Sequence, residues 1–204
     1  MKKLTAAFYQ RGDVAGIARE LLGKLLVTNF DGRRTAGRIA ETEAYNGVVD
    51  KASHSYGGRR TGRTAPMYAA GGIAYVYLCY GIHHLFNVVT AAQDMPHAVL
   101  IRAIEPVDGI DTMLTRMKKA TLDNTVGRGP GNVSKALGIA TAHTGLSLLK
   151  NDIYIADDGF AVKPPQLVIT PRIGVDYAAE DALLPYRFYI KGNPYVSGRK
   201  SFKS

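Results

Sequence analysis

Two carboxylates and a tyrosine alternate in the segment ETEAY, where Glu41, Glu43 and Tyr45 stand two residues apart. Because side chains alternate along a strand, a strand over this segment places all three on one face. A carboxylate flanked by an aromatic ring can activate a water molecule beside a stacked planar substrate. Taken alone, the segment also fits a solvated strand face, so its chemistry depends on the residues around it.

His54 in ASHS and Arg102 in LIRAIEP can complete such a site. Arg102 is a cation within an otherwise apolar strand, and a buried arginine needs an anionic partner such as a carboxylate or a phosphate. A structural hydrogen bond is the simpler explanation for each residue singly. Together with Glu43, the two residues define a candidate pocket.

The uncharged run IAYVYLCYGIHHLFNVV supplies further polar and aromatic candidates. Tyr75 and Tyr77 share one strand face, whereas Tyr80 lies on the other, at the expected turn. Asn87 is an amide in the middle of an apolar strand. It either binds a neighbouring backbone group, which is the commoner case, or contacts the edge of a substrate.

Metal and phosphate motifs are weak in this chain. His83, His84 and His97 are close in sequence, but HExxH and CxxC spacings are absent and Cys79 is the single cysteine, so no metal site is expected. The glycine-rich GRGPGN segment lacks the Lys-Ser/Thr pair of a Walker loop. It can still offer backbone N–H groups to a phosphate at the helix that follows.

Composition bounds the class of protein. The 204 residues contain 46% hydrophobic and 21% charged residues and have a formal net charge of +9, which suits one folded domain and favours a polyanionic partner. Arg59, Arg60 and Arg63 form the densest basic cluster of the first half, in a polar, glycine-rich loop. With one cysteine, no signal peptide and no convincing membrane span, we expect a cytoplasmic protein, associated with the nucleoid in a prokaryote.

The elements that position these residues follow from periodicity and turn residues. A helix is predicted over residues 12–24, with Asp13 as its cap, and a tight hairpin at Asp31-Gly32. Strands are expected at residues 73–80, 84–90 and 97–106 as a meander. A helix at 107–120, a glycine-rich loop entering a short helix within 126–139, and further strands follow. The mixture predicts an α+β fold: one domain over residues 1–204, with a curved, largely antiparallel sheet and surrounding helices.

Five segments occur in an order typical of one family: GRIAETEAYNG, ASHSYGGRRTGRTAPMY, AYVYLCYGIHHLFNVVT, AVLIRAIEP and RFYIKGNPYVS. These segments resemble those of the alkyladenine (3-methyladenine) DNA glycosylase family, and together they extend the resemblance over nearly the whole chain. The resemblance implies a mixed domain whose β-hairpin inserts into the DNA minor groove. It also implies a monofunctional enzyme of base excision repair that flips a damaged purine out of the duplex and hydrolyses its N-glycosidic bond.

The same resemblance assigns roles to residues. Glu43 corresponds to the general base and Arg102 to the arginine that helps to hold the catalytic water and a neighbouring phosphate, while Glu41 receives no catalytic role. Tyr45, His54 and Tyr77 correspond to the side chains that sandwich the flipped base. Tyr80 corresponds to the intercalating wedge and Asn87 to the residue that obstructs the 2-amino group of guanine. Arg59, Arg60 and Arg63 are expected on the DNA backbone.

The substrate implied is double-stranded DNA with a damaged purine of the 3-methyladenine, 7-methylguanine, hypoxanthine or etheno-adenine class, bound by a monomer. Neither a metal nor an organic cofactor is expected. Two departures concern DNA contacts: Asn132 replaces a lysine common in the family, and Ile82 follows the wedge where some members have methionine. A non-catalytic nucleic-acid-binding module is the alternative from another class, and a metal hydrolase that uses the histidines is a third.

Overall fold

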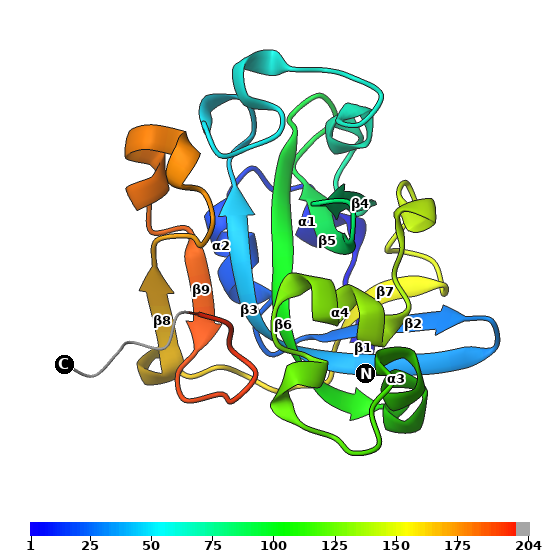
Figure 1. The fold of residues 1–204 in the computed structure, drawn as a ribbon. Helices are drawn as coiled ribbons and strands as arrows, with labels where there is room; N and C mark the ends of the chain where they lie inside the picture. Colours follow the sequence, from blue (N-terminus) through cyan, green and yellow to red (C-terminus); the bar gives the residue numbers. More distant parts are fainter. Residues whose placement is uncertain (199–204) are drawn as a thin grey trace.

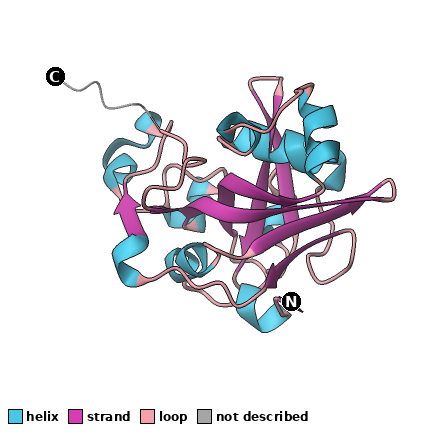
Figure 2. Cartoon of the chain, turned by 90° about the horizontal axis from the view of Figure 1, so that it is seen from below, coloured by secondary structure: helices cyan, strands magenta, loops and turns pink. Residues whose placement is uncertain are grey.

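The computed structural model describes residues 1–198, and in this range nine strands form one sheet. Its strands are β1 (Lys2–Lys3), β2 (Leu25–Phe30), β3 (Arg33–Tyr45), β4 (Ala74–Cys79), β5 (His83–Thr90), β6 (His97–Asp108), β7 (Ile153–Asp157), β8 (Leu167–Thr170) and β9 (Arg187–Ile190). The α-helices are α1 (Ala6–Tyr9), α2 (Val14–Glu20), α3 (Ile110–Met117) and α4 (Pro130–Leu137). Figure 2 shows the strands in the middle of the molecule with helices around them.

Local sequence explains the first elements. The Asp13 side chain accepts from the backbone N–H of Gly16 at 2.8 Å and caps α2. Asp31 and Gly32 take positive φ angles of 53° and 69°, as a tight turn between antiparallel strands requires. The predicted first helix, hairpin and meander of β4, β5 and β6 are therefore confirmed.

The sheet is antiparallel in every strand pair that the structure describes, and its order is β1-β7-β2-β3-β6-β5-β4. The long strand β3 pairs with β6 along one edge. Along the other edge it pairs first with β2 and then, from Glu41 to Glu43, with β9. The sheet thus divides at β3, and β8 and β9 lie to the left of β3 in Figure 1. The α+β class with a largely antiparallel sheet is confirmed.

An irregularity in the pairing of β3 with β6 changes the face on which side chains lie. The register shifts between Ile39 and Thr42. Before the shift, Ile39 packs in the main core. After it, Thr42 donates to the Ala18 carbonyl of α2 at 2.8 Å, so Glu43 and Tyr45 lie on the opposite face. Such irregularities re-aim side chains, and here one directs the acidic end of β3 away from the core.

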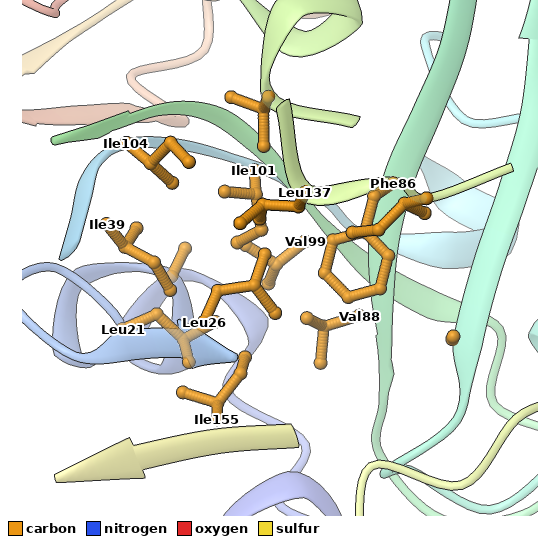
Figure 3. Close-up of a cluster of buried hydrophobic side chains, with 14 of the residues drawn as sticks. Leu21, Leu26, Ile39, Phe86, Val88, Val99, Ile101, Ile104, Leu137 and Ile155 are labelled. Atoms are coloured by element: carbon orange, nitrogen blue, oxygen red, sulfur yellow. The ribbon is translucent and has the colours of Figure 1, made fainter. Parts of the chain in front are cut away.

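The main core fills the face of the sheet that is covered by α2, α3 and α4, and Figure 3 shows a cluster of its side chains. Leu21, Leu26, Phe86, Val99 and Leu137 are among its fully buried residues. The opposite face carries smaller apolar clusters, and residues 52–68 and 175–182 contribute to two of them. Within residues 1–198, no helix has both the length and the apolar character needed to cross a bilayer.

Candidate active site

One row of cross-strand neighbours forms the floor of the site. Glu43 on β3 pairs with Leu100 on β6, Leu100 with Asn87 on β5, and Asn87 with Tyr75 on β4. Directly paired residues share a face of the sheet. The row therefore brings together the acidic, amide and aromatic candidates that are far apart in sequence, on the face opposite the main core.

Glu43 is fully buried and held by three donors. Its Oε1 accepts from the backbone N–H of Ile173 at 2.8 Å. Its Oε2 accepts from the Tyr45 hydroxyl at 2.9 Å and from Arg102 Nη1 at 3.3 Å. A carboxylate has about four acceptor positions, so about one is left for a water molecule. Burial raises the pKa of Glu43 despite the opposing charge of Arg102, which suits a general base.

Glu41 shares Arg102 with Glu43 and has further donors of its own. It accepts from Arg102 Nε at 3.1 Å, from Arg187 Nε at 2.6 Å and from the backbone N–H of Ser197 at 2.6 Å. All three donors hold it in a buried position. Arg102 therefore bridges both glutamates, and its Nη2 also donates to the Ser197 hydroxyl at 3.1 Å. Glu41 thus neutralises the buried cations Arg102 and Arg187 and has a structural role.

An aromatic pocket includes Tyr45, whose hydroxyl donates to Glu43. Its walls include Tyr45, His54, Tyr75, Tyr77 and Asn87, which come from β3, the following loop and the β4–β5 hairpin. The His54 and Tyr77 rings meet edge to face with centroids 4.5 Å apart. The cavity has a volume of about 30 Å³, on the order of one or two water molecules. In this closed form the rings of His54 and Tyr77 fill much of the pocket.

Asn87 binds neighbouring backbone groups, the commoner of its two expected roles, and it also lines the aromatic pocket. Its Nδ2 donates to the carbonyls of Tyr75 at 3.3 Å and Leu85 at 3.2 Å, and the same side chain lines the aromatic pocket. Because the amide is held by two backbone groups, its orientation in the pocket is fixed.

His54 is a neutral ring in this pocket. Burial is the main cause that lowers its pKa to about 4, and the charges of Arg63 and Arg59 act in the same direction. Burial likewise raises the pKa of Tyr45. The hydroxyl therefore stays protonated and donates a hydrogen bond to Glu43. The pocket lining is uncharged, and its Tyr45 hydroxyl connects it to the Glu43 carboxylate.

Arg172 packs against Tyr45, one of the residues that line the aromatic pocket. It forms a bidentate pair with Asp50, with Nη1 at 2.6 Å and Nη2 at 2.8 Å, and both side chains are buried. Its guanidinium carbon lies 4.9 Å from the centre of the Tyr45 ring. Asp50 also accepts from the backbone N–H of Asn46 and of Ala52. The pair thus fixes the loop that leads to His54 and covers one face of Tyr45.

The tip of the β4–β5 hairpin exposes large apolar side chains. Tyr80 is 92% exposed and Ile82 72%, and Tyr80 and Gly81 both have positive φ angles. The left-handed backbone at Tyr80 is uncommon for a residue with a side chain. Exposed apolar groups at one point are typical of an interaction site.

The predicted basic cluster is only partly open to a partner. Arg60 pairs with Asp94 at 3.0 Å and lies over the Tyr68 ring. Arg63 donates to His54 Nε2 at 3.2 Å. Arg59 is exposed, and its backbone carbonyl accepts from the Tyr68 hydroxyl. The loop around them contains short 3-10 turns at residues 47–49, 56–58 and 65–68.

The remaining sequence candidates lie elsewhere. His83 and His84 begin β5, whereas His97 pairs with Thr90 at its far end, and no group of three metal-ligating residues occurs among the described residues. Asn132 donates to the Arg128 carbonyl at 3.0 Å within the first turn of α4. Its side chain is thus directed to the helix start, where Gly131 packs against His83 beside the hairpin.

Sequence reasoning missed several residues that the structure brings to the site. They are Asp50, Arg172, Ile173, Tyr177 and Arg187. Arg187 carried the signal that identified Arg102, a cation within an apolar strand, in YRFYI. Tyr177 lines the aromatic pocket and donates to the Ala52 carbonyl at 3.1 Å. No local pattern marks Tyr177 or Ile173, because their segment lacks regular periodicity.

Comparison with known proteins agrees with this geometry. Residues 7–194 match the family model described as methylpurine-DNA glycosylase. The chain is similar to a Chlamydia abortus protein, with 48% identity over 192 residues, 92% of this chain and 97% of that protein. It is also similar to a Bacillus cereus protein, with 46% identity over 199 residues, 94% and 97% of the two chains. Both relatives bear the name "Putative 3-methyladenine DNA glycosylase". The resemblance seen in the sequence is confirmed, and the chain belongs to the methylpurine-DNA glycosylase family.

Proposed function

We propose that Glu43 is the general base with which this chain hydrolyses the N-glycosidic bond of a damaged purine. As a member of its family, the protein is a DNA glycosylase of base excision repair that acts on alkylated purines, 3-methyladenine among them. The observation that carries the proposal is the buried Glu43 carboxylate, which has one acceptor position left and an aromatic pocket beside it.

The reaction needs little acid catalysis. An alkylated purine such as 3-methyladenine is already cationic and leaves readily, so the protein has to supply an activated water. Glu43 accepts a proton from that water, and Arg102, which bridges Glu43 and Glu41, fixes the orientation of the carboxylate. No lysine lines the aromatic pocket within the described residues, which supports a monofunctional hydrolase without a Schiff base.

The pocket suits a flat cation. Tyr45, His54 and Tyr77 offer ring surfaces, and aromatic faces attract positive charge. Stacking of one base on such rings typically contributes about 1–3 kcal/mol. The neutral state of His54 avoids repulsion with the charged base. The fixed amide of Asn87 narrows the floor of the pocket and serves as the obstacle to the 2-amino group of guanine.

DNA contacts follow from the surface around the pocket. The hairpin tip with Tyr80 and Ile82 enters the minor groove and fills the space that the flipped nucleotide leaves, which offsets part of the cost of unstacking. Arg59, Arg60 and Arg63 face the backbone, and Arg60 exchanges its present partner for a phosphate. An open cavity of about 550 Å³ is lined by Arg128, Arg187 and Ile173 among others and suits the sugar–phosphate chain. The backbone N–H of Ile173 donates to Glu43.

The proposal takes residues 1–204 as one domain that acts as a monomer on duplex DNA. Its test is incubation of the protein with methylated duplex DNA, followed by chromatography of the released bases. Free 3-methyladenine with unbroken strands is expected. Tight binding without base release at any enzyme concentration would instead indicate a non-catalytic binding module. Separate duplexes that each hold one 7-methylguanine, hypoxanthine or etheno-adenine define the range of lesions.

A further inference from the structure

Arg63 contacts the wall of the aromatic pocket from outside. Its Nη2 donates to His54 Nε2 at 3.2 Å, and its guanidinium carbon lies 5.1 Å from the centre of the Tyr77 ring. The other ring nitrogen of His54, Nδ1, lies 2.9 Å from the Tyr75 hydroxyl. Both ring nitrogens of His54 therefore have a partner, and the two partners differ in chemistry.

The partner chemistry determines the position of the imidazole proton. A guanidinium has only donors, so the nitrogen that faces Arg63 must be unprotonated. A neutral imidazole with a bare Nε2 carries its proton on Nδ1, and that proton is donated to the Tyr75 hydroxyl. An imidazolium would place an N–H against the N–H of Arg63. The pair of hydrogen bonds thus selects one tautomer and excludes the charged ring.

We propose that Arg63 is a positioning residue of the base pocket, which fixes His54 as the neutral, Nδ1-protonated tautomer and keeps this wall uncharged for a cationic purine. The inference rests on the proposed role of His54 in stacking the flipped base. It gives Arg63 a task in the free protein that differs from the backbone contact expected from the sequence.

The surroundings of His54 contain no opposing influence. Its charged neighbours are Arg63 and Arg59, both cations, and its ring neighbours on β4 are Tyr75 and Tyr77. None of the described residues places a carboxylate within hydrogen-bond distance of the imidazole. The nearby charges and the hydrogen-bond geometry therefore favour the same neutral state, and Arg63 contributes to both.

Nuclear magnetic resonance of the full chain with nitrogen-15 histidine tests the inference without DNA. The His54 signals are identified by their loss in His54→Gln. Wild-type protein should show a protonated Nδ1 and a bare Nε2 at neutral pH. In Arg63→Ala, the Nε2-protonated tautomer should appear and the titration midpoint of His54 should rise by roughly one unit or more, because a like charge has been removed. Arg63→Lys, which keeps a cationic donor, should retain the wild-type tautomer.

Arg60→Ala is the matched control. It removes an equal charge from the same loop, but Arg60 contacts Asp94 and Tyr68 rather than His54, so the His54 signals should not change. An unchanged tautomer and midpoint in Arg63→Ala would overturn the proposal. Equal changes in Arg60→Ala would overturn it as well, because they would show a general charge effect.

A second measurement connects the tautomer to the substrate. Single-turnover rates are compared for duplexes with cationic 7-methylguanine and neutral hypoxanthine at pH 5, and their ratio cancels the protonation of Glu43, which both reactions share. A titration midpoint raised by one unit lowers the neutral fraction of His54 about twofold at this pH. The ratio of the 7-methylguanine rate to the hypoxanthine rate should therefore fall about twofold in Arg63→Ala and remain unchanged in Arg60→Ala. An unchanged ratio with a changed tautomer would refute the role in cation acceptance. Because the resonance experiment needs no DNA, its result does not depend on the proposed glycosylase function.

Discussion

Replacement of Arg172 by methionine should destabilise the protein strongly, although Arg172 touches no reacting atom. Methionine keeps much of the length of the side chain and removes the charge. The guanidinium donates to both oxygens of Asp50 and to the carbonyls of Ala44 and Asp181. Its carbon also lies within 5.4 Å of the centres of the Tyr45 and Tyr186 rings.

The expected loss follows from the burial of the pair. Arg172 has 0% and Asp50 1% side-chain exposure, so the variant leaves a carboxylate in the interior without its counterion. Removal of one partner of such a pair typically costs about 3–5 kcal/mol. The loss of the cation–π interaction with Tyr45 adds about 0.5–2 kcal/mol. Since small domains are stable by about 5–15 kcal/mol, this change removes a large fraction of the free energy of unfolding.

Urea unfolding of wild type, Arg172→Met, Asp50→Asn and the double variant measures the effect. The double variant should recover much of the loss, with a coupling energy on the order of 2 kcal/mol, because the uncompensated charge is then gone. Arg60→Met is the control, since the exposed Arg60–Asp94 pair should contribute less than about 1 kcal/mol. A loss below about 1 kcal/mol in Arg172→Met would refute the reasoning.

Three further predictions concern pH and DNA. The pKa of His54 is lowered to about 4 from 6.5, so the unfolded chain binds a proton first as the pH falls, and stability is lost between these two values. Urea titrations at pH 7 and pH 5 should show a loss of unfolding free energy that is about 2 kcal/mol larger in wild type than in His54→Gln. Tyr80→Ala should weaken binding to a lesion duplex but preserve the single-turnover rate at saturating enzyme, and equal affinity in fluorescence anisotropy would contradict the role of the wedge. Arg59→Ala should reduce the slope of log affinity against log salt by about one, because one cation that neutralises a phosphate is removed, and an identical slope would exclude Arg59 from the DNA interface.

The sequence predicted the elements well where the pattern was local. Asp13 and the Asp31-Gly32 pair act within a few residues, so the first helix and the hairpin could be placed from composition and turn chemistry. The alternation in ETEAY predicted Glu41 and Glu43 on one strand face, but not that both would contact Arg102.

The sequence alone could not predict the register between strands or the contacts between residues that are far apart in the chain. The row from Glu43 to Tyr75 depends on the pairing of four strands, and the irregularity near Ala40 that sets the facing of Glu43 has no local signature. The Ile173 backbone N–H reaches Glu43 from 130 residues along the chain. The same holds for Arg63, whose contact with His54 depends on how the polar loop folds back on the hairpin.

The most direct test of the central claim is the single-turnover rate of Glu43→Gln on duplex DNA that contains 3-methyladenine. Glutamine keeps the size of the side chain but cannot accept the proton of the attacking water. The rate of base release should fall by about 100-fold or more, while the affinity for lesion DNA and the unfolding transition remain close to those of wild type. Release within threefold of wild type by a folded Glu43→Gln variant would contradict the assignment of Glu43 as the general base.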